Sequence, residues 1–296
     1  MINKAALTPT IFLILTSIPA HAAGAVPQAP AIDLAPHRAI YDMSLRDALA
    51  SSNVSDIRGR LVFDFEGSPC AGYTLKSRLV TQVVDREGNS TLTDLRSSTW
   101  ENSDGDKFRF NSSQYIDQRL SDHVAGLAAR GKADDAIEVT IDKPERRRMK
   151  FTGAALFPTQ HSLAILEAAR HGKSVLQADI YDGSEKGDKL YETTTFIGNP
   201  SAGSAKPGRI KVEHTEKLDG MASWPVSIGY YEPAADPARD DGLPTYELSF
   251  RLFANGVSRD LVIDYGTFSV RGTLSRIDFH KPTECADRGA KRRQSR

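Results

Sequence analysis

The sequence is poor in cysteine and carries no surplus of charge. Cys70 and Cys285 are the only cysteines in 296 residues, and 38 basic side chains balance 38 acidic ones. A net charge near zero gives no general attraction for a phosphate backbone, so we expect no nucleic-acid partner. Neither cysteine has a CxxC partner or a nearby histidine that would activate it, so we expect no catalytic thiol.

Long apolar runs are also missing, except near the first residue. Residues 11–15 are the centre of an apolar stretch that follows Lys4 and precedes the small-x-small pattern Ala20-His21-Ala22. The stretch is shorter than the roughly 20 residues that a membrane-spanning helix needs. It predicts a cleaved secretory signal over residues 1–22, with a retained amphipathic anchor as the alternative. We therefore expect an exported protein without a transmembrane span.

Signatures of catalysis and of metal binding are missing too. The chain has no GxSxG, SxxK, GxGxxG or Walker pattern, and its histidines form no HExxH or other tight zinc spacing. His161 and His171 are ten residues apart on a predicted helix. About 15 Å along the helix axis separates them, so they cannot share a metal. We expect no catalytic residue, no metal, no cofactor and no enzymatic activity.

Two carboxylate-rich segments resemble calcium loops. Residues 101–106 and 182–188 are dense in Asp, Glu, Asn and Ser, but the first lacks the bidentate glutamate of a calcium loop. A hairpin turn at Asp104-Gly105 accounts for the same residue composition. We interpret both segments as turns.

Period-two alternation of apolar side chains recurs along most of the chain. Near its start, Ala39, Tyr41, Met43 and Leu45 face one way. Hairpin residues separate the segments, and Asn255-Gly256 is the strongest of these signals. The predicted strands are residues 36–45, 56–66, 72–85, 90–101, 106–116, 117–123, 137–141, 147–153, 174–181, 189–197, 209–214, 224–231, 245–254, 256–265 and 269–280.

One segment, residues 159–171, has the pattern of a helix. Leu163, Leu166 and Ala169 form its apolar stripe, with Ile165 at the margin. Thr159 is the expected N-cap and Gly172 the expected stop.

These elements predict an all-β domain over residues 36–285, with about fourteen mostly antiparallel strands and one main helix. So many strands without covering helices must curl into a barrel-like sheet, which also removes exposed edges. We expect the helix to pack against one opening of the sheet. Residues 23–35 are predicted to be a flexible lead-in.

The most informative stretch is 60–73, in which Leu61, Phe63 and Phe65 share a face. Gly67, Ser68 and Pro69 supply a tight turn before Cys70, and Gly72 allows a close approach or a bulge. In an oxidising compartment an even number of cysteines suggests one structural disulfide, here Cys70–Cys285, which would close a loop of about 216 residues. Two buried free thiols are the alternative.

Two clusters are strongly basic. Arg146, Arg147, Arg148 and Lys150 begin a predicted strand, where they form either a solvated face or a contact for an anionic surface or an acidic partner. Residues 286–296 are predicted to be a basic, disordered tail, which would bind a membrane surface only weakly.

Several short motifs occur together in a recognisable order. They are Pro36-His37-Arg38-Ala39 with Tyr41, Gly59-Arg60, Gly67-Ser68-Pro69-Cys70 with Gly72-Tyr73, Phe157-Pro158 with His161, Asn255-Gly256-Val257, Asp264-Tyr265 and the late Cys285. With these motifs the chain resembles the EipB-like family of periplasmic proteins from alphaproteobacteria, which support cell-envelope integrity. The resemblance extends from about residue 34 to Cys285.

The resemblance implies a β-spiral fold of about fourteen strands, a disulfide carried over to Cys70 and Cys285, and a periplasmic location. It implies no catalytic activity and no established ligand. We expect a non-enzymatic protein that binds an envelope component, either a lipid acyl chain or a protein segment, on or in its curved sheet. The alternatives are an interaction scaffold that uses its outer surface or an edge strand, and an enzyme acting on envelope polymers.

Overall fold

The alternating segments form one large sheet in the part of the chain that the computed structural model describes, residues 31–131, 135–202, 212, 214–233 and 242–285. The strands are β1 (His37–Ala48), β2 (Val54–Ser68), β3 (Gly72–Asp85), β4 (Ser90–Glu101), β5 (Lys107–Ile116), β6 (Arg119–Arg130), β7 (Ile137–Lys143), β8 (Arg147–Phe151), β9 (Val175–Ile180), β10 (Tyr191–Ile197), β11 (Ser201–Ala202), β12 (Ala222–Tyr231), β13 (Tyr246–Phe253), β14 (Ser258–Asp264) and β15 (Phe268–Phe279). The helices are α1 (Pro158–Arg170) and the 3-10 turn η1 (Glu216–Leu218). The predicted signal (1–22) and tail (286–296) lie outside the described residues.

The sheet consists of two meanders joined along one seam. From β8 back to β1, neighbouring strands follow the chain, and from β15 back to β9 they do so again. The seam between them is the antiparallel pairing of β1 with β15, which runs from His37 opposite Phe279 to Ala48 opposite Phe268. All fourteen pairings between the described strands are antiparallel. The predicted all-β fold with a curled antiparallel sheet and one main helix is confirmed.

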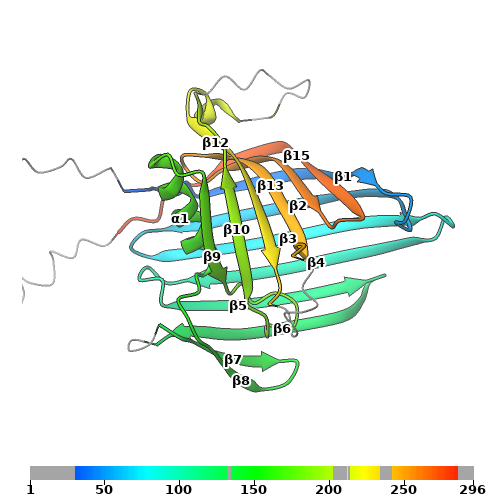
Figure 1. Cartoon of the computed structure of the whole chain (residues 1–296), viewed down its shortest axis with the longest axis horizontal. Helices are drawn as coiled ribbons and strands as arrows, with labels where there is room; N and C mark the ends of the chain where they lie inside the picture. Colours follow the sequence, from blue (N-terminus) through cyan, green and yellow to red (C-terminus); the bar gives the residue numbers. More distant parts are fainter. Residues whose placement is uncertain (1–30, 132–134, 203–211, 213, 234–241, 286–296) are drawn as a thin grey trace, which may run out of the picture. The chain divides into compact units, whose positions relative to one another are not determined.

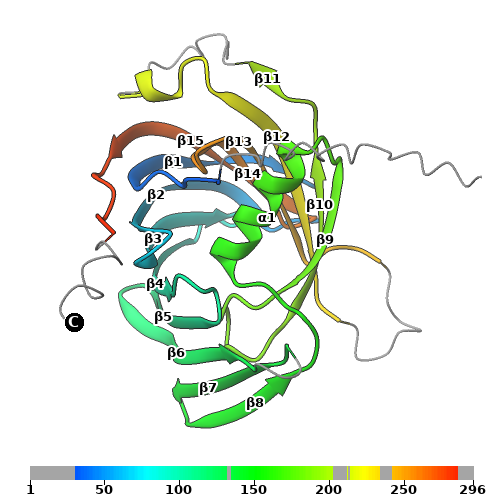
Figure 2. The ribbon, with the colours of Figure 1, turned by 90° about the vertical axis from the view of Figure 1, so that its left-hand side faces the viewer.

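The two ends of this sheet, β8 and β9, are consecutive strands in the chain. No ladder between them is found within the described ranges, and the connection that carries α1 spans the gap. Leu156 lies beside β9, donates its N–H to the Asp179 carbonyl at 2.7 Å and accepts the Tyr181 N–H at 3.0 Å. Figures 1 and 2 show the sheet curling with α1 on its concave side, beside β9 and β10. The sheet is therefore curled but not closed.

Alternation places the apolar side chains of β1 on one face of the sheet. Ala39, Tyr41 and Met43 of β1 are buried, as predicted, while residues between them are exposed or half-buried. On α1, Ile165 and Leu166 are buried and pack in one cluster with Phe65 of β2 and Trp224 of β12. A second cluster joins β5, β7 and Tyr181 beyond the helix. The helix thus fills one part of the concave space.

Both ends of α1 show how far its capping could be predicted. The predicted N-cap Thr159 is wrong: Phe157 is the N-cap residue and Pro158 occupies the first helical position, where its missing N–H costs nothing. Gly172 is confirmed as the stop, because it has a φ of +68° and donates its N–H to the Ala169 carbonyl at 3.1 Å.

The predicted apolar stripe of α1 is shifted. Leu163 is only partly buried, whereas Ile165, which was expected at the margin, is 2% exposed and central to the packed face. His161 is buried beside it, with its Nε2 3.4 Å from Thr195 Oγ1. The helix contacts β9 and β10 of the sheet.

Two expectations about loops and strands need correction, and a third falls mostly outside the described residues. A strand was expected from Asp117, but Asp117 and Gln118 have φ values of +48° and +67° and form the turn before β6. The predicted strand at 209–214 lies mostly outside the described residues, and Val212 and His214 are not in a strand. The lead-in is not flexible throughout: Leu34 is 4% exposed, and Ala35 donates its N–H to the Asn255 carbonyl at 2.9 Å.

The cysteine-bearing turn is tighter and later than expected. β2 continues through Gly67 and Ser68, so the turn itself is 69–71. Gly67 has a φ of +124°, and a Cβ there would lie 2.1 Å from the Gly72 carbonyl oxygen. At Gly72 a Cβ would lie 2.3 Å from the Glu101 carbonyl oxygen, which confirms the predicted close approach. Only glycine fits at either position.

The disulfide between Cys70 and Cys285 is confirmed, with the two Cα atoms 5.7 Å apart. It fastens the β2–β3 turn to the segment that follows β15. The two residues are 215 positions apart in the sequence, so the bond removes a very large loop from the unfolded ensemble.

We predict that Cys70→Ser, Cys285→Ser and the double variant all lower the free energy of unfolding, by at most about 5 kcal/mol from loop entropy. In thermal unfolding under oxidising conditions, the midpoint should fall by roughly 5–15 °C. Reduced wild-type protein should match the double variant. Equal midpoints for oxidised and reduced wild type would contradict the prediction.

Candidate functional site

A partly open cleft lies where α1 begins. Its walls come from the concave face of β2 to β4, the first turn of α1, the segment before β1 and the β13–β14 hairpin. The apolar side chains Leu34, Phe63, Phe65 and Leu75 form much of its lining. Asn255-Gly256, the hairpin predicted from the sequence, closes one side. We call this site the helix-start cleft.

The cleft is small. Its volume is about 130 Å³, close to the roughly 150 Å³ of an engineered apolar cavity that binds one benzene molecule. Pockets for drug-sized ligands usually measure about 300–1,000 Å³. The helix-start cleft therefore encloses a single side chain or an equally short group, and a longer ligand would extend past its rim.

Glu101 is the most unusual residue of the cleft. It is the last residue of β4 and is 3% exposed. Its Oε1 accepts the backbone N–H of Thr159 at 2.6 Å, so this carboxylate caps the start of α1 from another strand. Its Oε2 is buried and has no hydrogen-bond partner among the described residues. Burial raises the pKa of Glu101, although the Thr159 hydroxyl and the N–H groups of Thr159 and Gln160 oppose the shift.

His37 is the second titratable side chain of the cleft. It is 3% exposed, and its Nδ1 lies 2.7 Å from the Ala35 carbonyl oxygen. Since a carbonyl can only accept, Nδ1 carries the proton. Burial lowers the pKa of His37, which favours the neutral ring and leaves Nε2 as an acceptor.

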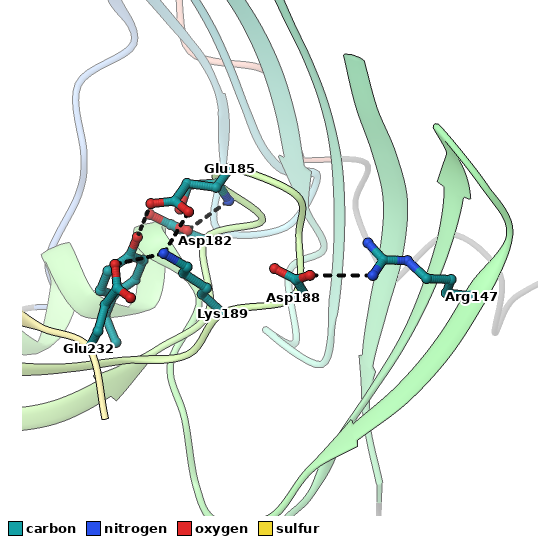
Figure 3. Close-up of polar contacts among 8 residues, drawn as sticks. Arg147, Asp182, Glu185, Asp188, Lys189 and Glu232 are labelled. Carbon is teal, nitrogen blue, oxygen red and sulfur yellow. Dashed lines mark hydrogen bonds and ion pairs between the residues drawn. The ribbon is translucent and has the colours of Figure 1, made fainter. Parts of the chain in front are cut away.

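The predicted basic cluster divides between two environments. Arg147 is half-buried and lies 3.3 Å from Asp188 (Figure 3). It also donates to the Lys186 carbonyl at 3.2 Å. Arg146, Arg148 and Lys150 are exposed, at or on the edge strand β8. Strand alternation explains the division, because successive side chains point to opposite faces. The predicted contact for an anionic surface therefore reduces to the three exposed residues.

Two of the three carboxylates in the predicted turn 182–188 pair with cations, and the third, Asp182, accepts the Ser184 N–H at 2.8 Å. Lys189 Nζ lies 2.6 Å from Glu185 and 2.7 Å from Glu232, and Asp188 faces Arg147 (Figure 3). In the turn 102–105, the Asn102 side chain accepts the backbone N–H groups of Asp106 and Lys107. These contacts give both segments a structural role as turns.

One group of metal-ligating types was not predicted. Asp64, Glu66 and His280 offer ligand atoms that all lie within 4.8 Å of one another, and His280 Nε2 lies 2.7 Å from Asp64 Oδ1. The histidine is 216 positions from Asp64, so the group could not be predicted from a local sequence motif. The hydrogen bond between His280 and Asp64 accounts for the close approach of these two side chains.

Within the described ranges, no helix has both the length and the apolar character needed to cross a membrane.

Comparison with known proteins gives a consistent result. The model of the EipB-like family matches residues 28–281. The cell envelope integrity protein EipB of Brucella abortus (strain 2308) is 37% identical over 258 residues, which are 87% of this chain and 89% of that protein. A crystal structure of a beta-barrel-like protein of the domain of unknown function DUF1849, also from Brucella abortus, has a TM-score of 0.77 and 35% identity, covering 85% of this chain and 100% of the other.

We predict that Glu101→Gln removes a pH-dependent part of the free energy of unfolding. Because the folded-state pKa of Glu101 is raised, its contribution is fully present below the unfolded pKa, near 4.5, and is lost as pH rises through the folded pKa. The variant should therefore be relatively more stable than wild type at pH 7 than at pH 4. Urea unfolding at both pH values measures the difference, with exposed Glu87→Gln as the control.

Parallel stability curves for wild type and Glu101→Gln across this pH range would contradict the raised pKa.

Proposed function

The chain belongs to the EipB-like family, and from this membership we propose that it supports the integrity of the cell envelope as a periplasmic, non-enzymatic binding protein. The family match and the relative named for envelope integrity support the role. The predicted export signal supports the location. The proposed activity is the binding of a segment of another envelope protein in the helix-start cleft.

The size and lining of the cleft carry this proposal. An apolar volume of about 130 Å³ fits one inserted side chain and is too small to enclose a whole acyl chain. The partly open rim would leave the rest of a polypeptide segment outside. In many protein–protein interfaces, much of the binding energy comes from one anchoring residue that fills a small pocket of this kind.

The lining also supports a binding role over a catalytic one. Glu101 and His37 are the only titratable residues among the thirteen described residues that line the cleft. One Glu101 oxygen is committed to the start of α1, and the His37 Nδ1 proton to the Ala35 carbonyl. Neither arrangement places a nucleophile beside a base, which an enzyme acting on envelope polymers would need.

A second candidate function uses the outer surface. Arg146, Arg148 and Lys150 lie at or on β8, an edge strand of the sheet. Exposed basic side chains on an edge both discourage strand-to-strand aggregation and attract anionic surfaces. This observation favours contact with anionic headgroups as an auxiliary role.

We predict that filling the cleft abolishes function. Leu75→Trp places an indole in the apolar wall, whereas Lys76→Trp, the matched control, places it on the exposed face of the same strand. In cells that lack the chromosomal gene, Lys76→Trp should restore resistance to detergent and Leu75→Trp should not. Thermal unfolding of both variants verifies that they fold.

Normal resistance with Leu75→Trp would contradict the proposal. Lipid extraction and native mass spectrometry of protein purified from the periplasm test the acyl-chain version. One tightly held acyl chain per protein would replace the protein segment as the occupant.

We predict that the double variant Arg146→Glu/Arg148→Glu weakens binding to vesicles containing anionic lipid. Each basic residue near such a surface contributes about 1 kcal/mol, so two charge reversals should reduce binding at least about tenfold at low salt. Arg119→Glu, an exposed arginine on β6, is the control. Equal co-sedimentation of both variants and the wild type would refute the auxiliary role.

A further inference from the structure

The helix-start cleft contains one buried acceptor that lacks a donor among the described residues, and two further groups that can accept hydrogen bonds. Glu101 Oε2 is buried and makes no hydrogen bond within the described residues. His37 offers Nε2, because its Nδ1 proton is directed to the Ala35 carbonyl. Ser162 donates its hydroxyl proton to the Pro158 carbonyl at 3.0 Å, so it too can only accept further bonds. A group with several N–H or O–H donors complements this lining.

The charges of the cleft specify the sign of that group. Among the thirteen described lining residues, Glu101 is the one carboxylate, and none is Lys or Arg. The positive end of α1 is already met by Glu101 Oε1 through the Thr159 N–H. The second oxygen of a buried carboxylate gains most from a cationic donor.

The structure assigns a ligand class to the cleft: we infer that it recognises the side chain of a lysine presented by a partner protein. The inference rests on the proposed function, since it names the residue type that the cleft would receive. The ammonium group would meet Glu101 Oε2, and the apolar stem would lie against Phe63, Phe65 and Leu75.

Two other cationic ligands fit less well. An arginine presents a planar fork that binds a carboxylate through both oxygens, but Oε1 of Glu101 is occupied by Thr159. An ethanolamine lipid carries a phosphate two carbons from its amine, and no cationic side chain among the described lining residues would neutralise it. Lysine combines a compact point charge with a four-carbon apolar stem.

The test uses the full exported chain and two matched peptides, acetyl-Gly-Lys-Gly-amide and acetyl-Gly-norleucine-Gly-amide. Norleucine keeps the apolar stem and replaces the ammonium with a methyl group. Binding is followed by NMR titration of the Thr159 and Gln160 amide signals. We expect the lysine peptide to bind about tenfold more tightly than the norleucine peptide, as a charge-assisted hydrogen bond would produce.

The Glu101→Gln variant should lose this preference while binding the norleucine peptide within about twofold of wild type. That retained binding also shows that the variant folds. Equal binding of the two peptides to wild type overturns the lysine assignment and leaves the proposed function standing. If neither peptide binds, both ideas fail. Binding of dihexanoyl phosphatidylethanolamine in preference to the lysine peptide replaces the protein partner with a lipid.

Discussion

The antiparallel pairing of β1 with β15 is the contact on which the rest of the sheet depends. It joins two meanders that would otherwise be separate sheets, each with an edge to protect. Closing a loop of more than two hundred residues costs about 5 kcal/mol of chain entropy. The Cys70–Cys285 bond constrains almost the same loop, so it reduces the cost of the very contact it lies beside. The β1–β15 pairing and the disulfide therefore stabilise the curled sheet together.

The helix-start cleft is a consequence of how that curl is filled. α1 packs on the concave face through Ile165 and Leu166, and its first N–H groups arrive at the end of β4. A helix start buried against a sheet needs an acceptor, and Glu101 supplies one across 58 positions of sequence. The second oxygen of this carboxylate, Glu101 Oε2, then has no hydrogen-bond partner among the described residues. Glu101 thus stabilises the start of α1 with one oxygen and, in our proposal, binds a ligand with the other.

The strands were predictable because their signals are local. Alternation in β1 and the Asn255-Gly256 hairpin depend on neighbours in sequence, and both were confirmed. The helix start was misplaced because Thr159 has the right chemistry for a cap, whereas Pro158 moved the cap to Phe157. Glu101 as the centre of a site was not predictable, since its importance comes from burial under a distant helix. The division of the basic cluster required knowing which face of β8 meets the turn that holds Asp188.

The pairing of β1 with β15 also determines when the sheet can be completed. β1 is among the first strands to be made and β15 is the last, with Ala48 paired to Phe268 at its far end. Because about 220 residues separate Ala48 from Phe268, one edge of β1 has no partner until most of the chain has been delivered. Until then β1 can pair only with β2, on its other edge. The long separation of the two seam strands therefore exposes the unfinished chain to edge-to-edge pairing with other chains.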